Sequence, residues 1–243
     1  MSKPSESLLG PVGREPLSVL VAGRIRDAIV AGELADGAPL PGEKTLGERF
    51  GVGRSTVREA LRILQAQGLV SGGDRVSTRT PIVNGAGAVS SAAFALENVL
   101  RLGQVPLPDL VGMRLLIETA AIAEAAPKLD AATQGRAEDA IAEMEAAGDD
   151  VERFIDADVA FHAALIDAAG NAAYVLVNNV LRGTMAGHLR AALEREPERA
   201  AVMQRLNGEH RAILEAAAAG DGALAARRMG AHIRDFYEAR VEP

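Results

Sequence analysis

The chain has 243 residues, 48% hydrophobic and 24% charged, with a formal net charge of −7 and no cysteine, which excludes disulfides and thiolate metal sites. Its length and composition predict two globular domains of unequal size. No apolar run approaches the roughly 20 residues that cross a bilayer, and residues 1–15 predict a disordered arm without the apolar core of a signal peptide, so we expect a cytoplasmic protein with no membrane partner.

The acidic total conceals an uneven distribution of charge. Residues 1–83 hold 11 basic and 9 acidic side chains, a net charge of +2, whereas the remaining residues hold 15 and 24, a net charge of −9. Because exposed charges beyond a Debye length of about 8 Å are largely screened, the local balance governs contact with a polyanion. The N-terminal part can therefore accept phosphates, and the acidic remainder disfavours a second surface of that kind.

The N-terminal part predicts three helices and a hairpin. Residues 17–31 place their apolar side chains on one stripe, which indicates an amphipathic first helix. Residues 44–50 and 54–67 predict two further helices, separated by a tight turn at Gly51–Gly53 and closed by Gly68. This order is typical of a helix-turn-helix, so we assign residues 16–80 to a winged helix-turn-helix domain with a small β wing.

The third predicted helix has two different faces. Val57, Leu61 and Leu64 follow one another at i, i+4 and i+7, so this stripe packs inward. Guanidinium groups can fork onto guanine or neutralise phosphates, and hydroxyl groups can bond to either. Side chains of these types cluster on the outward face, which favours insertion into the DNA major groove over the alternative of a merely solvated surface helix: they are Arg54, Ser55, Thr56, Arg58 and Arg62.

The remainder of the chain changes character. Pro81–Gly87, reading PIVNGAG, predicts a linker by its Pro, Gly and Asn content. Beyond it, residues 88–243 are rich in alanine, poor in β-branched residues and free of period-two alternation, which predicts a second, all-α domain. Short connections between long helices favour an antiparallel helical bundle, with helices expected at residues 89–102, 107–128, 131–147, 151–169, 172–194, 197–219 and 222–239.

All four histidines of the chain lie in this predicted bundle, on four consecutive helices. Asp158 and His162 stand four residues apart, so their side chains project from one helix face with Cβ atoms about 5 to 6 Å apart. A single divalent ion in the core could collect both of them together with His210 and His232. Taken as spacing alone this pattern is weak, because a lone helical histidine is more often a hydrogen-bonded or exposed side chain.

Residues 52–61, VGRSTVREAL, together with LPGE at 40–43 and GLV at 68–70, resemble the winged-helix head of GntR-type bacterial transcription regulators. The family's hairpin wing would follow here, but residues 71–77, SGGDRVS, depart from its usual pattern, and Asp74 would repel phosphate. The resemblance also implies a backbone contact from the preceding helix. By likeness to the family, the residues that contact DNA are Arg49, Arg54, Ser55, Thr56 and Arg58.

The segment DVAFHAAL at 158–165, followed by Gly170–Asn171, resembles the FCD effector domain that accompanies this head in the FadR subgroup. The resemblance extends over nearly the whole chain, from about residue 17 to 239. It gives His188 no counterpart among the metal ligands. It implies a divalent metal ion, Zn²⁺ in the first place with Ni, Co or Mn as alternatives, bound by Asp158, His162, His210 and His232.

Three neutral imidazoles and one carboxylate around a divalent cation leave a net charge of +1, which attracts an acid. Arg114, in an Arg-x-x-x-Glu helix, faces the same cavity by the family resemblance; the alternative is a surface ion pair with Glu118. Asn178 shares a helical stripe with Leu181 and Met185, so it can hydrogen-bond an effector or serve as a polar link in the core.

These patterns together predict a homodimeric transcription regulator that binds double-stranded operator DNA, expected to be a repressor controlled by a small carboxylic acid. Two recognition helices that read half-sites about one DNA turn apart require two-fold symmetry. Two alternatives stay open: a purely structural metal, or a metal-dependent hydrolase. We expect no enzyme, because the chain has neither His-Glu-x-x-His nor Gly-x-Ser-x-Gly, and Glu209 is the one obvious spare carboxylate near the metal.

Overall fold

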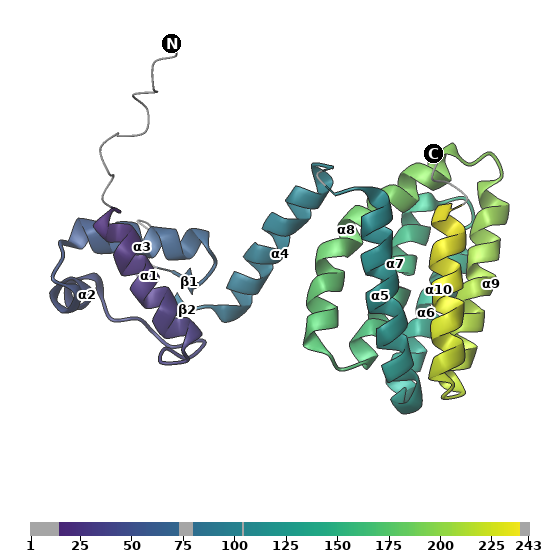
Figure 1. Ribbon diagram of the computed structural model, residues 1–243, viewed down its shortest axis with the longest axis horizontal. Helices are drawn as coiled ribbons and strands as arrows, with labels where there is room; N and C mark the ends of the chain where they lie inside the picture. Colours follow the sequence, from purple (N-terminus) through teal and green to yellow (C-terminus); the bar gives the residue numbers. More distant parts are fainter. Residues whose placement is uncertain (1–14, 73–79, 104, 239–243) are drawn as a thin grey trace, which may run out of the picture. The chain divides into compact units, whose positions relative to one another are not determined.

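The computed structural model describes residues 15–72, 80–103 and 105–238 (Figure 1). The chain divides into two compact units, with the division between Ala92 and Ala93. Helix α4, Gly85–Arg101, crosses this division. Within the described residues, no helix combines the length and the apolar character that a membrane span requires.

The N-terminal unit is built on helices α1 (Leu17–Val30), α2 (Glu43–Phe50) and α3 (Arg54–Ala66). Helix α2 ends where Gly51 adopts a left-handed conformation with φ of 67°, which a glycine takes without steric cost. Helix α3 starts after Gly53 and packs against both α1 and α2. The predicted helix-turn-helix is therefore present, with helix bounds within one residue of those expected.

A small core holds this unit together. It consists of apolar side chains from the three helices, from the loop between α1 and α2, and from two short strands. The inner stripe of α3 packs into this core, which leaves its outer face exposed to solvent. The buried residues are Val21, Ala22, Ile25, Leu40, Leu46, Val57, Ala60, Leu61, Leu64, Val70 and Val83.

Two short antiparallel strands close the unit, β1 (Val70–Ser71) and β2 (Ile82–Val83), with Val70 opposite Val83 and Ser71 opposite Ile82. They form the base of the predicted wing. The predicted wing residues 73–77, including Asp74, lie outside the described residues.

The predicted linker, residues 81–87, has regular secondary structure. It contains strand β2 and the first turn of α4, which begins at Gly85 instead of Val89. The reason is a long-range contact: Val83 is 2% exposed in the core, and its backbone N–H donates to the carbonyl of Ala38. Asp36 accepts a hydrogen bond from the backbone N–H of Gly85 at 2.7 Å and so satisfies one of the free amides at the start of the helix.

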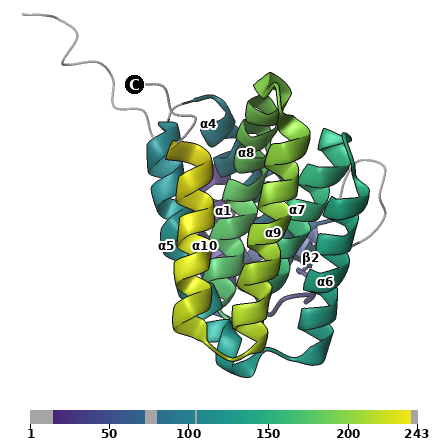
Figure 2. The ribbon, with the colours of Figure 1, turned by 90° about the vertical axis from the view of Figure 1, so that its right-hand side faces the viewer.

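The C-terminal unit is a helical bundle, as predicted. Helix α10 packs against α5 and α9, and α7 packs against α5, α6 and α8 (Figure 2). Short loops join α6 to α7, α7 to α8 and α9 to α10, so these neighbours run antiparallel. The helices are α5 (Leu107–Ala125), α6 (Ala131–Ala146), α7 (Val151–Ala168), α8 (Ala172–Arg195), α9 (Arg199–Ala218) and α10 (Gly222–Glu238), with a short 3₁₀ helix η2 (Ala126–Lys128) after α5.

Local sequence signals fix the ends of the bundle helices. Asp130, Asp150 and Asn171 each accept a hydrogen bond from a backbone N–H in the first turn of α6, α7 and α8. Helix α7 ends before Gly170, and α9 ends before Gly220, both left-handed, with φ of 70° and 75°. Consequently the bounds of α5 to α10 agree with those expected from the sequence to within two residues, except that α5 ends at Ala125, where η2 continues the chain.

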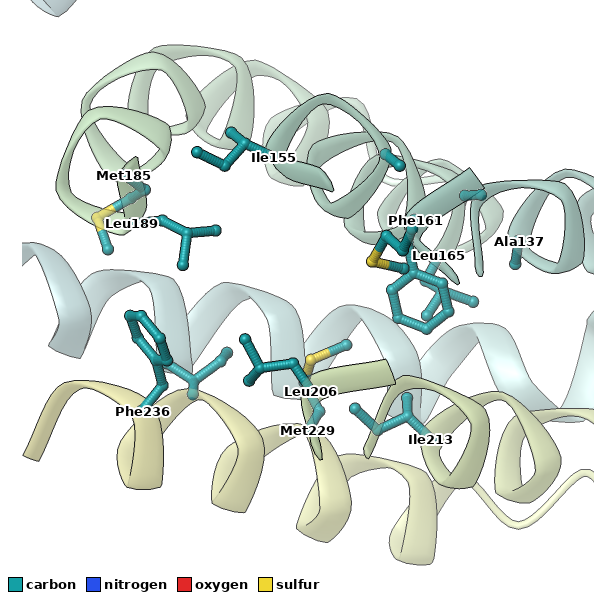
Figure 3. Close-up of a cluster of buried hydrophobic side chains, with 14 of the residues drawn as sticks. Ala137, Ile155, Phe161, Leu165, Met185, Leu189, Leu206, Ile213, Met229 and Phe236 are labelled. Carbon is teal, nitrogen blue, oxygen red and sulfur yellow. The ribbon is translucent and has the colours of Figure 1, made fainter. Parts of the chain in front are cut away.

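The bundle core extends along α7 and reaches every helix from α5 to α10. Figure 3 shows Phe161 and Leu165 of α7 beside Ile213 and Met229 of α9 and α10. Phe161 is fully buried. Because α7 is enclosed in this way, the polar side chains on its inner face are removed from solvent, and this is what creates the candidate site.

Candidate metal centre and DNA-contacting surface

Three helices bring together the four residues predicted to bind a metal. Asp158 and His162 lie on α7, His210 on α9 and His232 on α10, and one nitrogen or oxygen atom from each lies within 4.8 Å of the others. Oδ1 of Asp158 lies 3.8 Å from Nε2 of His162 and 3.2 Å from Nε2 of His210. All four side chains are buried, so the cluster is a polar site within an apolar core.

The hydrogen bonding of the cluster is incomplete among the described residues. Nε2 of His162 and Nδ1 of His210 are buried and have no hydrogen-bond partner. A buried polar atom without a partner costs about 1 to 3 kcal/mol, so such atoms are uncommon unless something else binds them. Three imidazoles and one carboxylate are a donor set suited to a divalent transition metal, and the free nitrogens therefore fit an ion at this position.

Two carboxylates outside the cluster orient its histidines. Nδ1 of His162 lies 2.5 Å from Oε2 of Glu118 on α5, and Nδ1 of His232 lies 2.8 Å from Oε2 of Glu209 on α9. A carboxylate can only accept, so each ring donates from Nδ1 and keeps Nε2 for the cluster. This is the arrangement that typically fixes metal-binding histidines. The sequence does not predict either role, because neither carboxylate lies near its histidine in the chain.

Arg114 and Glu118 form the predicted i, i+4 ion pair, with Nε and Oε1 2.6 Å apart. It is not the exposed pair considered from the sequence, because the two side chains are 11% and 3% exposed. Nη1 of Arg114 also lies 3.4 Å from the hydroxyl of Tyr237. Burial acts to raise the pKa of Glu118, but the charges of Arg114 and His162 outweigh it and lower the pKa to about 2. Glu118 is therefore ionised whenever it supports His162.

The pKa shifts of His210, His232 and Asp158 also suit metal binding. Burial lowers the pKa of His210, and burial together with the neighbouring His210 and His162 lowers the pKa of His232 well below its usual value. Burial acts to raise the pKa of Asp158, but the adjacent His162 and His210 outweigh it and hold the pKa well below its usual range. Neutral imidazoles and an ionised carboxylate are the forms that coordinate metals.

A cavity lies directly beside the cluster. It encloses about 380 Å³ not filled by protein atoms, including its opening to solvent. Arg114 and Asn178, the two residues predicted to bind an effector, both line it, together with Asp158 and His162 of the cluster. His188 is half-buried on α8 and is not part of the lining. Leu181, Met185 and Leu189 supply an apolar wall.

The outer face of α3 presents the residues predicted to contact DNA. Arg54, Ser55, Arg58 and Arg62 are exposed, Thr56 is half-buried, and Arg49 is exposed on α2. In the described part of the chain Arg49 and Arg54 make no ion pair, whereas Arg62 lies 3.2 Å from Glu59. Arg58 is held by both oxygens of Glu43, at 3.0 and 2.8 Å. The sequence alone does not predict this pair, which links the two helices of the motif.

An exposed basic helix in a helix-turn-helix and a helical domain with a ligand cavity together define a ligand-responsive DNA-binding regulator. The chain belongs to the GntR family: the family model "Bacterial regulatory proteins, gntR family" matches residues 17–79, and the model "FCD domain" matches residues 109–235. The protein is therefore a transcription regulator with an effector-binding domain and not an enzyme.

Curated relatives agree with this assignment, and a solved structure shares the fold. The chain is 34% identical over 213 residues to the transcriptional regulator LutR of Bacillus subtilis, covering 85% of this chain and 93% of that protein. It is 30% identical over 173 residues to the transcriptional repressor NanR of Cronobacter sakazakii, covering 70% and 65%. The structure of a GntR protein from Streptococcus agalactiae shares the fold, with a TM-score of 0.61, 24% identity and coverage of 90% and 98%.

Proposed function

We propose that this protein is a homodimeric repressor whose affinity for operator DNA is controlled by a small carboxylic acid bound beside a divalent metal ion. Asp158, His162, His210 and His232 would hold the ion, with Zn²⁺ as the first choice and Ni, Co or Mn as alternatives. Arg114 and Asn178 would hydrogen-bond the acid. The observation on which this rests is the buried ligand cluster with free ring nitrogens that opens onto a cavity.

The charges around the cavity support an anionic ligand. Arg114 and Glu118 neutralise each other, and an imidazole that coordinates a metal does so in its neutral form. A divalent ion with the single carboxylate of Asp158 therefore leaves a net charge of +1, which one carboxylate balances. When bound, the ion supplies a Lewis-acidic coordination position for that carboxylate. Arg114 and Asn178 orient the acid, and the apolar wall excludes water.

The hydrolase alternative loses its candidate base. Glu209 accepts from His232 and forms an ion pair with Arg205, so it is not available to activate water. A regulator needs no such base. It requires only that the acid binds the bundle more tightly in one packing than in another, and the change in operator affinity cannot exceed that difference, typically about 1 to 3 kcal/mol.

The central experiment measures operator binding by fluorescence anisotropy with metal-loaded protein, in the presence and absence of sugar acids, hydroxy acids and dicarboxylates. Metal content is determined on the same preparation by atomic emission. We expect one class of acid to weaken binding to a genomic operator fragment about 5- to 150-fold. If no acid in the panel stabilises the protein or changes its DNA affinity, the proposal is wrong.

The orientation of the histidines gives a second prediction. Replacing Glu118 with glutamine should weaken metal binding about 10- to 100-fold, because His162 loses the ionised carboxylate that fixes its ring. Competition with a fluorescent chelator measures this change. Glu124 on the same helix hydrogen-bonds Tyr174 away from the cluster, so Glu124→Gln is the matched control and should bind metal like the natural protein. Equal metal affinity in both variants would contradict an orienting role for Glu118.

An exposed apolar stripe supports the proposed dimer. On α4, Val89, Leu96 and Val99 are 52%, 51% and 44% exposed, and Ala92 between them is exposed as well. Their spacing of three, four and three residues is that of a coiled-coil seam, which packs well against an identical seam. A second copy of the chain is the occupant that this self-complementary pattern and the two-fold symmetry of operator binding both favour.

Replacing Leu96 with glutamate should therefore convert dimers to monomers, because a charge in the seam would lose solvation on pairing. Sedimentation velocity as a function of concentration measures this, and operator affinity should fall about 100-fold or more as the two heads become independent. Asn98 is exposed on the opposite face of the same helix, and Asn98→Glu is the matched control. A Leu96→Glu protein that dimerises like the natural one would place the interface elsewhere.

A further inference from the structure

The cavity beside the ligand cluster is lined by a second arginine, which differs from Arg114 in its surroundings. Arg182 lines it from α8, one turn after Asn178. It is exposed and makes no ion pair with any described residue. Arg114 differs in this respect, since its Nε lies 2.6 Å from Glu118 and its Nη1 contacts Tyr237. The Arg114–Glu118 pair thus offers hydrogen-bond donors without net charge, whereas Arg182 offers hydrogen-bond donors together with a positive charge.

We infer that the effector is a dianionic acid, with one carboxylate at the metal and the second at Arg182. This inference rests on the proposed function. The metal-loaded cluster has a net charge of +1, and Arg182 raises the total around the cavity to +2, which a dicarboxylate neutralises and a monocarboxylate leaves half balanced. Arginine suits this role because its planar fork binds a carboxylate through two parallel hydrogen bonds.

The arrangement of the cavity wall also orients such a ligand. Asn178 and Arg182 lie four residues apart on α8, so they occupy the same helix face and follow one another along the cavity. The metal ligands Asp158 and His162 approach from α7. An acid that spans from α7 to α8 would tie these two packed helices together, which is how binding could select one packing of the bundle.

The test compares acids that differ only by a terminal carboxylate: propionate with succinate, lactate with malate, and butyrate with glutarate. Their dissociation constants are measured by isothermal titration calorimetry on zinc-loaded full-length protein. We expect at least one diacid to bind about 10- to 100-fold more tightly than its monoacid partner, the range of a charge-assisted hydrogen-bonded pair. In Arg182→Ala this preference should vanish while the affinity for the monoacid stays unchanged.

Arg195 is exposed on the same helix and does not line the cavity, so Arg195→Ala should retain the preference for the diacid. Zinc content of each variant, measured in parallel, shows that the cluster is intact. Equal affinities for both members of every pair would overturn this inference, and so would a diacid preference that survives in Arg182→Ala. In either case, binding of the monoacids would leave the proposed function standing. Failure of every acid to bind the zinc-loaded natural protein would overturn both.

Discussion

Replacing His210 with alanine is expected to weaken metal binding more than about 100-fold, because even the loss of an outer partner of a ligand costs 10- to 100-fold. His210 is fully buried, and its ring centroid lies 5.4 Å from that of His162 and 4.4 Å from that of His232. Its imidazole is therefore enclosed with the other nitrogen donors of the cluster. The response of operator binding to any effector acid should disappear together with the metal.

Metal content after equilibrium dialysis against buffered Zn²⁺ measures the first effect, and operator binding with and without the acid measures the second. His188, a half-buried histidine outside the cluster, provides the control variant His188→Ala, which should keep both properties. Circular dichroism separates loss of the ligand from loss of the fold. A folded His210→Ala protein that still binds Zn²⁺ at natural affinity would disprove the assignment of the cluster.

The same cluster distinguishes an effector-site ion from a structural one. The ligands come from α7, α9 and α10, which already share a continuous apolar core that includes Phe161, Ile213 and Met229. Because these apolar contacts do not involve the ion, we expect chelation to abolish acid binding with only a modest fall in melting temperature. A structural zinc site can contribute about 10 to 16 kcal/mol to folding, so unfolding of the chelated protein would favour the purely structural alternative.

The sequence predicts helix ends well because their signals are local. Gly51, Gly170 and Gly220 each follow an apolar pattern of helical period, and each is left-handed in the structure. Caps such as Asp130 act within three residues. The segment 81–87 shows the limit of such signals. Its composition indicates a linker, but Val83 pairs with Val70 thirteen residues earlier, and this contact outweighs the local preference.

The candidate site is likewise predictable from the sequence only in part. The spacing of Asp158 and His162 indicates a shared helix face, and the family resemblance adds the two distant histidines, which the structure brings within reach of them. The orienting carboxylates have no sequence signature, since Glu118 precedes His162 by 44 residues. Arg182 belongs to the same class of residue: an exposed arginine on a helix is uninformative until the fold places it in a cavity.

Replacing Arg54 with alanine should reduce operator affinity about 5- to 150-fold, equivalent to about 1 to 3 kcal/mol, if its guanidinium forms a bidentate hydrogen bond with a guanine. Arg54 begins the recognition helix, is exposed and has no ion-pair partner among the described residues, so it reaches DNA without breaking an existing bond. The loss of sequence discrimination should be confined to one base pair of the operator. Competition with operators mutated at single positions detects it, because the variant no longer discriminates at the contacted pair.

Arg58 should behave differently, because Glu43 already binds its guanidinium through both carboxylate oxygens. If Arg58 forms a bidentate hydrogen bond with a guanine, its ion pair with Glu43 must first break. Arg58→Ala then also relaxes the base preference at one position of the operator. If it contacts phosphate, affinity falls uniformly across sequences, and the slope of log affinity against log salt decreases by about one. Arg227, exposed in the helical domain, gives the control Arg227→Ala, whose operator affinity should be unchanged. Natural affinity in both Arg54→Ala and Arg58→Ala would show that this face of α3 does not read DNA.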